Sequence, residues 1–170
     1  MTEIPELRTQ RLTLRAFRAD DLDAFAAINA DPGFMQHLGN GLPRSRDETW
    51  AQMESALGQW ALRGYGLFAV DVKGTFAGRV GIFQPADWIE PELAWGLGAG
   101  FWGAGLATEA AAAARDWAFG RFGWTELASF IRPANVRSRR VAEKLGAEMS
   151  GTTLLRGGVV ERWVHRNAAG

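Results

Sequence analysis

Alternating hydrophobic positions mark the extended segments of this chain. Residues 11–15 (RLTLR) alternate between polar and apolar, which predicts a first strand with Leu12 and Leu14 facing the core. A period of two returns on both sides of Lys73-Gly74 and of Gly157-Gly158, which predicts two hairpins. The further strands predicted in this way cover residues 66–72, 75–83, 92–97, 126–132, 148–155 and 159–165.

Start and stop signals mark the helices. Asp20 or Asp21 can cap a helix that runs to about residue 30, and Ser45 with Glu48 forms a capping box ahead of a helix that runs to about residue 63. Two more helices are predicted at 103–119, stopped by Gly120, and at 138–145, closed by Gly146. The order β-αα-βββ-α-β-α-ββ predicts an α/β (mixed α+β) fold. Its centre is a mixed, mostly antiparallel twisted sheet of about seven strands, with helices on both faces.

Length and composition narrow the class of protein. The 170 residues correspond to one domain, 1–170, with 19 basic and 19 acidic residues, so there is no basic excess for nucleic acid to bind. The chain has no cysteine, which excludes disulfides and cysteine-based zinc sites, and we expect no metal. No apolar run reaches the roughly 18 residues of a membrane span, and residues 1–10 are polar and unlike a signal peptide. We therefore expect a soluble, cytoplasmic protein without a membrane partner.

The most informative segment is residues 92–110, ELAWGLGAGFWGAGLATEA, which reads as strand, glycine-rich turn and helix. Gly103 and Gly105 allow the backbone to approach a ligand closely. Amides at a helix N-terminus are free donors at the positive end of the helix dipole. The segment therefore predicts a pocket for a pyrophosphate, although a glycine-rich connector without a ligand remains open at this point.

Gly98, Gly100 and Gly103 also spell the G-x-G-x-x-G dinucleotide fingerprint. A run of strands precedes it, whereas a Rossmann unit normally begins its domain. The following strand carries Glu126 at its start rather than an acidic residue at its end, and no further βαβ unit follows. No Gly-Lys-Ser/Thr of a Walker A loop occurs either. A dinucleotide-dependent oxidoreductase is therefore the weaker interpretation.

Four segments together resemble the GNAT acetyltransferase superfamily, in particular its ribosomal-protein alanine N-acetyltransferases of the RimJ/RimL type. The segments are T-x-R-L-x-L-R (9–15), E-L-x-W-x-L (92–97), F-W-G-x-G-L-A-T-E-A (101–110) and N-x-x-S-x-x-V-x-E-K-L-G (135–146). They span most of the chain. The resemblance implies the GNAT fold and an acyltransferase. Such an enzyme moves an acetyl group from acetyl-CoA to a primary amine by direct attack in a ternary complex.

The resemblance also implies which residues hold CoA. The backbone around Trp95 would pair with the pantetheine arm, the amides of residues 103–108 would cradle the pyrophosphate, and Asn135 would border the arm near the thioester. A basic cluster surrounds the motif at Asn135 and consists of Arg132, Arg137, Arg139 and Arg140. We expect one of them, with preference for Arg139 or Arg140, to bind the 3′-phosphate, although a solvated helix face would also explain the cluster. The full implied set is Trp95, Gly96, Leu97, Trp102, Gly103, Ala104, Gly105, Leu106, Ala107, Thr108, Asn135, Ser138, Arg139 and Arg140. Gly100 and Ala104 depart from the family pattern, which often has polar or basic residues there.

Glu92 is the predicted general base, because several GNAT branches have a glutamate here and burial in the sheet would raise its pKa toward neutrality. Strand alternation places Glu92, Ala94 and Gly96 on one face, which leaves room for an acceptor. Glu90 is the spare base, and a surface or arginine-paired role for Glu92 remains open. A backbone amide near Leu97 would stabilise the oxyanion.

The general acid is less defined in the sequence. Many GNAT enzymes have a tyrosine where this chain has Ala142, and the single tyrosine, Tyr65, is remote in sequence. Ser138 is the predicted substitute, although a helix-capping role would also explain it. Trp60 and Trp88 are candidates to shape the acceptor pocket. Lone histidines such as His165 are expected to be structural.

Several alternatives stay open in the sequence. A non-catalytic CoA-binding or sensor module would share the fold, and Ala142 favours it. The acceptor, a protein N-terminus or a small-molecule amine, has no recognisable signature, so a ribosomal protein, an amino acid, a polyamine and an antibiotic all fit. Self-association into a homodimer is also left open.

Overall fold

A single eight-stranded sheet forms the centre of the computed structural model, which describes residues 3–169. All neighbouring strands are antiparallel except β5 and β6. The spatial order is β1 (Leu7–Arg8), β2 (Leu12–Arg15), β3 (Leu67–Val72), β4 (Thr75–Phe83), β5 (Glu92–Leu97), β6 (Glu126–Ile131), β8 (Gly158–Arg166) and β7 (Glu148–Leu155). The predicted mixed, mostly antiparallel sheet is confirmed, and the two-residue strand β1 is the addition to the seven expected strands.

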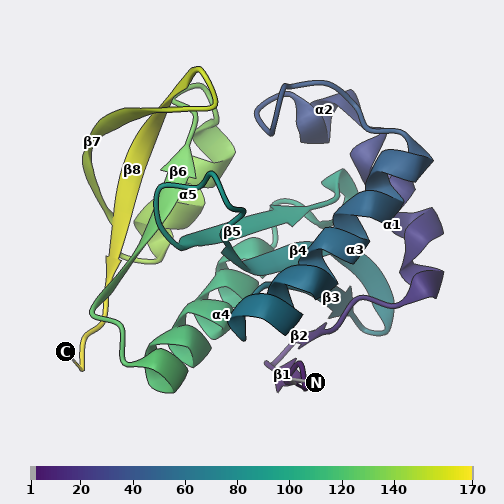
Figure 1. Cartoon of the computed structure of the whole chain (residues 1–170), viewed down its shortest axis with the longest axis horizontal. Helices are drawn as coiled ribbons and strands as arrows, with labels where there is room; N and C mark the ends of the chain where they lie inside the picture. Colours follow the sequence, from purple (N-terminus) through teal and green to yellow (C-terminus); the bar gives the residue numbers. More distant parts are fainter. Residues whose placement is uncertain (1–2, 170) are drawn as a thin grey trace.

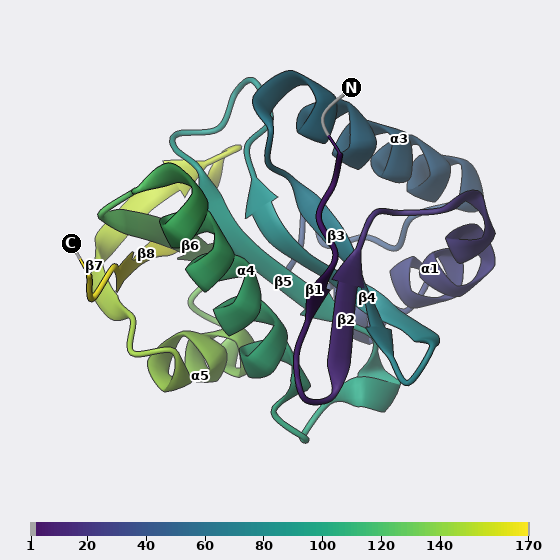
Figure 2. The same cartoon turned by 90° about the horizontal axis from the view of Figure 1, so that it is seen from below.

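Helices cover both faces of the sheet, as predicted. Figures 1 and 2 show α1 (Leu22–Asn29) and α3 (Arg46–Arg63) on one face and α4 (Leu106–Phe122) on the other. The helix α5 (Val136–Lys144) packs against β6 and α4. Two short 3₁₀ turns, Ala19–Asp21 and Ala99–Phe101, precede α1 and follow β5. Among residues 3–169, no helix is long and apolar enough to cross a membrane.

Two helix starts differ from the sequence prediction. The first helix ends near residue 30 as predicted, but the additional short helix α2 (Pro32–Met35) follows at once, because the Asp31 side chain accepts a hydrogen bond from the amide of Gly33. The helix α5 begins two residues early because the Asn135 side chain caps it by accepting from the amide of Ser138. In both cases an Asp or Asn side chain satisfies a free amide of the first turn.

The predicted end of α4 was wrong. Gly120 lies inside the helix, and the helix ends three residues later at Gly123, whose φ of 67° is left-handed. A glycine stops a helix only where the backbone turns into that region, and its identity alone does not require the turn. The start also moves, because Gly105 (φ 76°) remains in the turn and the helix begins at Leu106.

Two cores hold the layers together. Between the sheet and α4, four fully buried alanines of the helix, Ala110, Ala111, Ala114 and Ala118, allow it to lie close to the sheet. On the other face, Phe17, Phe25 and Phe76 pack against one another under α1 and α3. The small side chains of α4 thereby fix the glycine-rich turn directly after the end of β5.

Candidate active site

The strands β5 and β6 form a fork. They pair at only one position, Glu92 opposite Ala128, and then separate. Beyond this pair, hydrogen bonds to side chains replace those between the two backbones. The Ser129 hydroxyl donates to the Leu93 carbonyl (2.6 Å), and the Phe130 amide donates to Glu92 Oε1 (3.0 Å). The parallel ladder is therefore ended by side chains at the point where the strands diverge.

A buried histidine supports this fork. His165 Nε2 lies 2.8 Å from Ser129 Oγ, and the histidine is 1 % exposed. Burial lowers the pKa of His165 to about 4, with a further contribution from the charge of Arg115, so the ring is neutral at physiological pH. The Ser129 hydroxyl donates its proton to the Leu93 carbonyl, so Ser129 Oγ acts as the acceptor toward His165. His165 is therefore in its Nε2–H form, and hydrogen bonds run from His165 through Ser129 to Leu93. The expected structural role of His165 agrees with this geometry.

The backbone of β5 faces the open side of the fork beyond Leu93. The Leu97 carbonyl accepts a hydrogen bond from the Trp102 indole at 2.7 Å on this side, whereas the Gly98 amide donates to Ala77 of the β4 side. Alternate residues of a strand direct their backbone groups to the same side. The amide and carbonyl of Trp95 therefore face the fork, where no strand of residues 3–169 pairs with them.

Glu92 is buried at the base of the fork, with 7 % of its surface exposed. Its Oε1 accepts from the Phe130 amide, and its Oε2 accepts from the Trp88 indole at 2.8 Å. Burial raises the pKa of Glu92 to about 7, because the loss of hydration outweighs these two hydrogen bonds and the charge of Arg79. The predicted near-neutral carboxyl is confirmed.

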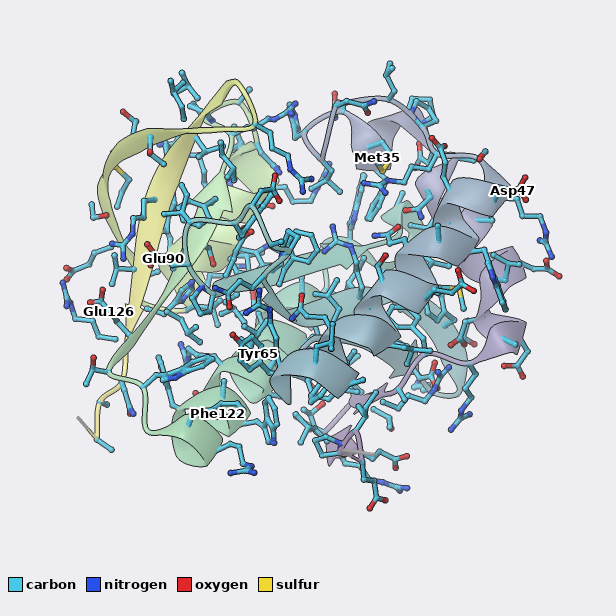
Figure 3. The ribbon with its side chains drawn as sticks, viewed as in Figure 1. Met35, Asp47, Tyr65, Glu90, Phe122 and Glu126 are labelled. Carbon is cyan, nitrogen blue, oxygen red and sulfur yellow. The ribbon has the colours of Figure 1, made fainter. Side chains whose placement is uncertain are left out.

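Two adjoining cavities open from the fork. The larger, about 170 Å³, contains Glu92 and is bounded by α2, where Figure 3 labels Met35, and by the β7–β8 turn. The smaller, about 60 Å³, runs between Trp95 to Leu97 of β5 and the α5 residues Ser138 and Val141, and it ends at Trp102. The residues Trp95, Asn135 and Ser138 line both cavities. The cavities therefore meet beside the N-terminus of α5.

The glycine-rich turn lies next to the smaller cavity, whose lining includes Trp102 and Ala107 on either side of the turn. Gly103 (φ 83°) and Gly105 (φ 76°) both have left-handed backbone, and a side chain built at Gly103 would meet no atom within 4 Å. The helix α4 starts there without a side-chain cap. Its first amides, at residues 106–108, are thus left without helical acceptors beside open space. This arrangement fits the pyrophosphate of CoA.

The opening motif of the chain supports this turn from outside. Glu109, in the first turn of α4, accepts hydrogen bonds from the Thr9 hydroxyl (2.7 Å) and from the backbone amide and side chain of Arg11. The Arg11 guanidinium also donates to the Ala104 carbonyl at 2.8 Å. The T-x-R motif and the glycine-rich turn, about 95 residues apart in the sequence, therefore form one structural unit. Sequence reasoning did not identify the role of Glu109.

A family model for the acetyltransferase (GNAT) domain matches residues 11–148. The chain belongs to the GNAT acetyltransferase family. It is therefore an acyltransferase whose family uses acetyl-CoA, which agrees with the cavity that ends at the glycine-rich turn. The resemblance of the four sequence motifs to this family is confirmed.

Individual relatives are similar over nearly their full length. The uncharacterised protein YkkB of Bacillus subtilis is 30% identical over 154 residues, which cover 86% of this chain and 87% of that protein. The crystal structure of an acetyltransferase from Agrobacterium tumefaciens has a TM-score of 0.86 at 33% identity, covering 97% of this chain and 96% of that one. RimL, a ribosomal L7/L12 α-N-protein acetyltransferase solved in complex with CoA, shares the fold with a TM-score of 0.80 at 18% identity, covering 98% and 100% of the two chains.

The structure separates the arginines that follow Asn135. Arg137 lines the smaller cavity, and its guanidinium carbon lies 3.3 Å from the centre of the Trp102 ring. Arg139 Nε lies 3.2 Å from a carboxylate oxygen of Glu161 without the alignment of a hydrogen bond, and Arg140 is exposed. Arg137 is therefore the arginine of this GNAT chain that lies beside the cavity, whereas the sequence favoured Arg139 or Arg140.

The remaining predicted residues fall at several places. Half of the predicted CoA-binding set lines the smaller cavity, namely Trp95, Gly96, Leu97, Trp102, Ala107, Asn135 and Ser138. The glycine-rich turn supplies the rest of the backbone set, Gly103, Ala104, Gly105, Leu106 and Thr108, with the Leu106 side chain buried in the core.

Three further sequence candidates lie elsewhere. Glu90 pairs with Arg162 of β8 at 2.7 Å and does not line either cavity. Trp60 is 1 % exposed in the core, so of the two tryptophans only Trp88 shapes the larger cavity. Figure 3 shows Tyr65 beside Phe122, where their rings meet edge to face, and Tyr65 lines neither cavity.

Proposed function

We propose that this GNAT enzyme transfers an acetyl group from acetyl-CoA to a primary amine, with Glu92 as the general base. One observation carries the proposal: a buried carboxyl with a pKa of about 7 lies in the larger cavity, and that cavity adjoins the smaller one beside α5. A base with such a pKa can accept a proton near neutral pH and release it again.

The smaller cavity accounts for the binding of CoA. The backbone amide and carbonyl of Trp95 would pair with the pantetheine arm as an added strand would, because the fork leaves them without a partner strand. The amides of Gly103 to Thr108 would hold the pyrophosphate at the start of α4. Arg137, stacked on Trp102 at the cavity wall, would add a cation for a phosphate.

When bound, acetyl-CoA supplies the thioester whose acetyl group moves to the amine. An α-amine has a pKa near 8, so most of the acceptor enters protonated at pH 7. Glu92 receives that proton, directly or through a water, and thereby frees the nitrogen lone pair for the carbonyl carbon. The Trp88 indole and the Phe130 amide hold the carboxyl in place during this step.

Ser138 is the proposed donor of a proton to the departing thiolate. Its amide is already capped by Asn135, so its hydroxyl is not needed to cap α5. It also lines both cavities, where the thioester would lie. The lack of a tyrosine at Ala142, which is fully buried, leaves this hydroxyl as the nearest substitute.

The family resemblance defines the class of acceptor less closely than it defines the CoA site. The RimJ/RimL-type motifs favour a protein N-terminus, and a small-molecule amine also fits an open cavity of this size. The decisive experiment measures CoA release with a panel of amines and thermal protection by acetyl-CoA and by NAD. Acetyl-CoA at a hundred times its Kd should stabilise the protein by about 2.7 kcal/mol, and NAD should not.

A non-catalytic CoA-binding module would give a different result in the same experiment. Thermal protection by acetyl-CoA without thiol release from any amine would support that module and refute the proposed transfer. Protection by NAD alone would refute the assignment of the smaller cavity to CoA.

A further inference from the structure

The larger cavity is strongly basic. Among residues 3–169, its lining contains one acidic side chain, Glu92, and that carboxyl is partly neutral near pH 7. Its cationic lining residues come from four separate segments of the chain: Arg44, Arg79, Arg132 and Arg156. A cavity that accepts an amine as its only charged ligand would not be expected to concentrate arginines, because they repel an ammonium group.

Most of the other partly buried arginines in this protein are paired with carboxylates. Arg15 donates to both Asp21 and Asp71, with distances from 2.6 to 2.9 Å. Within the cavity lining, Arg156 is held by Asp87 at 3.0 Å. Arg132 donates to the carbonyl of Gly39. These residues therefore have defined structural partners.

Arg79 is the exception. It lies on β4 opposite Gly96 of β5, and its guanidinium carbon comes within 3.8 Å of the place where a Gly96 side chain would begin. Its Nε is buried and has no hydrogen-bond partner among residues 3–169. Burial lowers the pKa of Arg79 to about 10; the charge of Glu92 opposes this shift, and the charge of Arg44 makes a smaller contribution in the same direction as burial. Two arginines thus lie near each other at this wall, and within the described part of the chain no carboxylate forms a salt bridge with either.

The charges of Glu92 and Arg79 attract each other, but among residues 3–169 the two side chains form neither a hydrogen bond nor a salt bridge. The carboxylate oxygens of Glu92 accept instead from the Phe130 amide and the Trp88 indole. An unpaired buried guanidinium is costly for folding. Such a group is retained where an anion binds, since an arginine presents a planar set of donors that matches a carboxylate.

We propose that the acceptor amine carries a carboxylate, which binds to Arg79 and Arg44 while its amine faces Glu92. The inference rests on the proposed function and specifies its substrate class. Glu92 and Arg79 lie on the same face of two adjacent strands, because their partners Phe83 and Gly96 do. Glu92 and Gly96 are four residue steps apart on β5, roughly 13 Å along the strand, and the side chains of Glu92 and Arg79 span much of that distance. Their charged ends are near enough to interact electrostatically. The short gap between them suits an acceptor whose amine and carboxylate lie close together, as in an amino acid or in the first residue of an acidic peptide.

Matched acceptors test this proposal and distinguish the two sources of the carboxylate. L-Alanine and L-alaninamide differ in the α-carboxylate, and the dipeptide amides Glu-Gly-NH2 and Gln-Gly-NH2 differ in a side-chain carboxylate beside a free N-terminus. We expect kcat/KM for the acid to exceed that of its neutral partner by about tenfold or more in one of the pairs, the usual scale of a charge-assisted contact. The pair that discriminates identifies the source. Less than twofold discrimination in both pairs, or a preference for spermidine, would overturn the proposal.

Variants connect this preference to the arginines. Arg79→Gln should reduce the discrimination to within about twofold, and Arg44→Gln should reduce it partially, while acetyl-CoA protection stays unchanged. Arg46→Gln is the matched control, because Arg46 pairs with Asp23 on the exposed start of α3 and lines neither cavity. Persistent discrimination in Arg79→Gln would refute the role of Arg79.

A binding measurement separates this inference from the proposed function. Glutarate, a dicarboxylate without an amine, should raise the Tm of the wild type in the presence of CoA and should not raise that of Arg79→Gln. The unliganded Arg79→Gln variant should also melt no lower than the wild type, because it removes an unpaired buried charge. Thermal protection by glutarate without any acetyl transfer would support the anion site and refute the proposed function. Acetyl transfer without protection by glutarate and without a preference for acidic acceptors would support the function and refute the anion site.

Discussion

Replacing Glu92 with glutamine tests both the buried carboxyl and its role as a base. The change keeps the length of the side chain and removes the group that titrates near pH 7. It also changes the local hydrogen bonds, since both carboxylate oxygens accept and an amide offers only one oxygen. Either the Phe130 amide or the Trp88 indole must then face an NH2 group, which costs about 1–3 kcal/mol.

The pKa of Glu92 determines how stability depends on pH. Burial raises this pKa from 4.5 to about 7, so the folded state binds the proton more tightly than the unfolded state. A raised pKa means that the stabilising contribution is complete below pH 4.5 and is lost as the pH rises through 7. A shift of this size corresponds to roughly 3 kcal/mol. The free energy of unfolding of the variant, relative to the wild type, should therefore rise by most of that amount between pH 5 and pH 8.

The catalytic rate of the same variant tests the role of Glu92 as a base. A positioned base contributes about 10²-fold or more, so kcat of Glu92→Gln should fall by about 10²-fold with acetyl-CoA affinity nearly unchanged. The acidic limb of the wild-type pH–rate profile, with an apparent pKa near 7, should disappear. Steady-state kinetics from pH 6 to 9 and urea unfolding at pH 5 and 8 measure the two effects independently.

Glu90→Gln is the matched control. Glu90 undergoes the same chemical change, but it is paired with Arg162 outside both cavities. It should keep the acidic limb and lose at most the small free energy of a partly exposed ion pair. The reasoning is refuted if Glu92→Gln keeps full kcat across pH 6 to 9, or if its relative stability does not change with pH.

Variants at three further positions test the CoA side of the site. Ala104→Glu should weaken CoA binding about tenfold or more by placing a negative charge at the proposed pyrophosphate cradle, and Ala104→Arg should strengthen it, with Ala104→Gln as the neutral control in calorimetry. Asn135→Ala removes the cap of α5, so it should lose about 1 kcal/mol of stability by denaturation and roughly 1–3 kcal/mol of transition-state stabilisation, measured as kcat/KM for acetyl-CoA. Asn135→Ser should restore the stability but not kcat/KM. If Asn135→Ala and the wild type have equal kcat/KM, Asn135 acts only as a cap. Ser138→Ala should lower kcat by about tenfold or more without destabilising α5, and an unchanged kcat would exclude its hydroxyl as the acid.

Local signals predicted most of the fold. The capping box of Ser45 and Glu48 is formed, and Gly64 ends the same helix in the left-handed region. The hairpin turn at Lys73-Gly74 lies between its predicted strands, whereas the second turn is one residue earlier than predicted, at Arg156-Gly157, and Gly158 already belongs to β8. These features depend on neighbouring residues alone, so the sequence contains what determines them. The end of α4 was missed because the backbone of Gly120 could continue the helix as well as stop it.

The candidate site could be predicted only in part. Glu92 and Asn135 belong to motifs, and their positions on β5 and before α5 follow from those motifs. Arg79 was not selected and Arg137 was not the preferred arginine, because their importance comes from contacts between distant segments. Arg79 did leave a signal in the sequence: it is the single charge within the nine-residue strand TFAGRVGIF, which is otherwise apolar or small. A charge in a central strand is rarely buried without a function.

The small residues of β5 show why the pattern of a strand does not by itself define an acceptor site. Alternation placed Glu92, Ala94 and Gly96 on one face and predicted open space there. At Gly96 that space is filled: a side chain would start 3.1 Å from the Phe34 ring and 3.8 Å from the Arg79 guanidinium. The absence of a side chain at Gly96 thus admits an aromatic ring from α2 and a cation from β4 to the wall of the cavity. What the acceptor meets is set by these two distant segments, and its chemistry must therefore be read from their side chains.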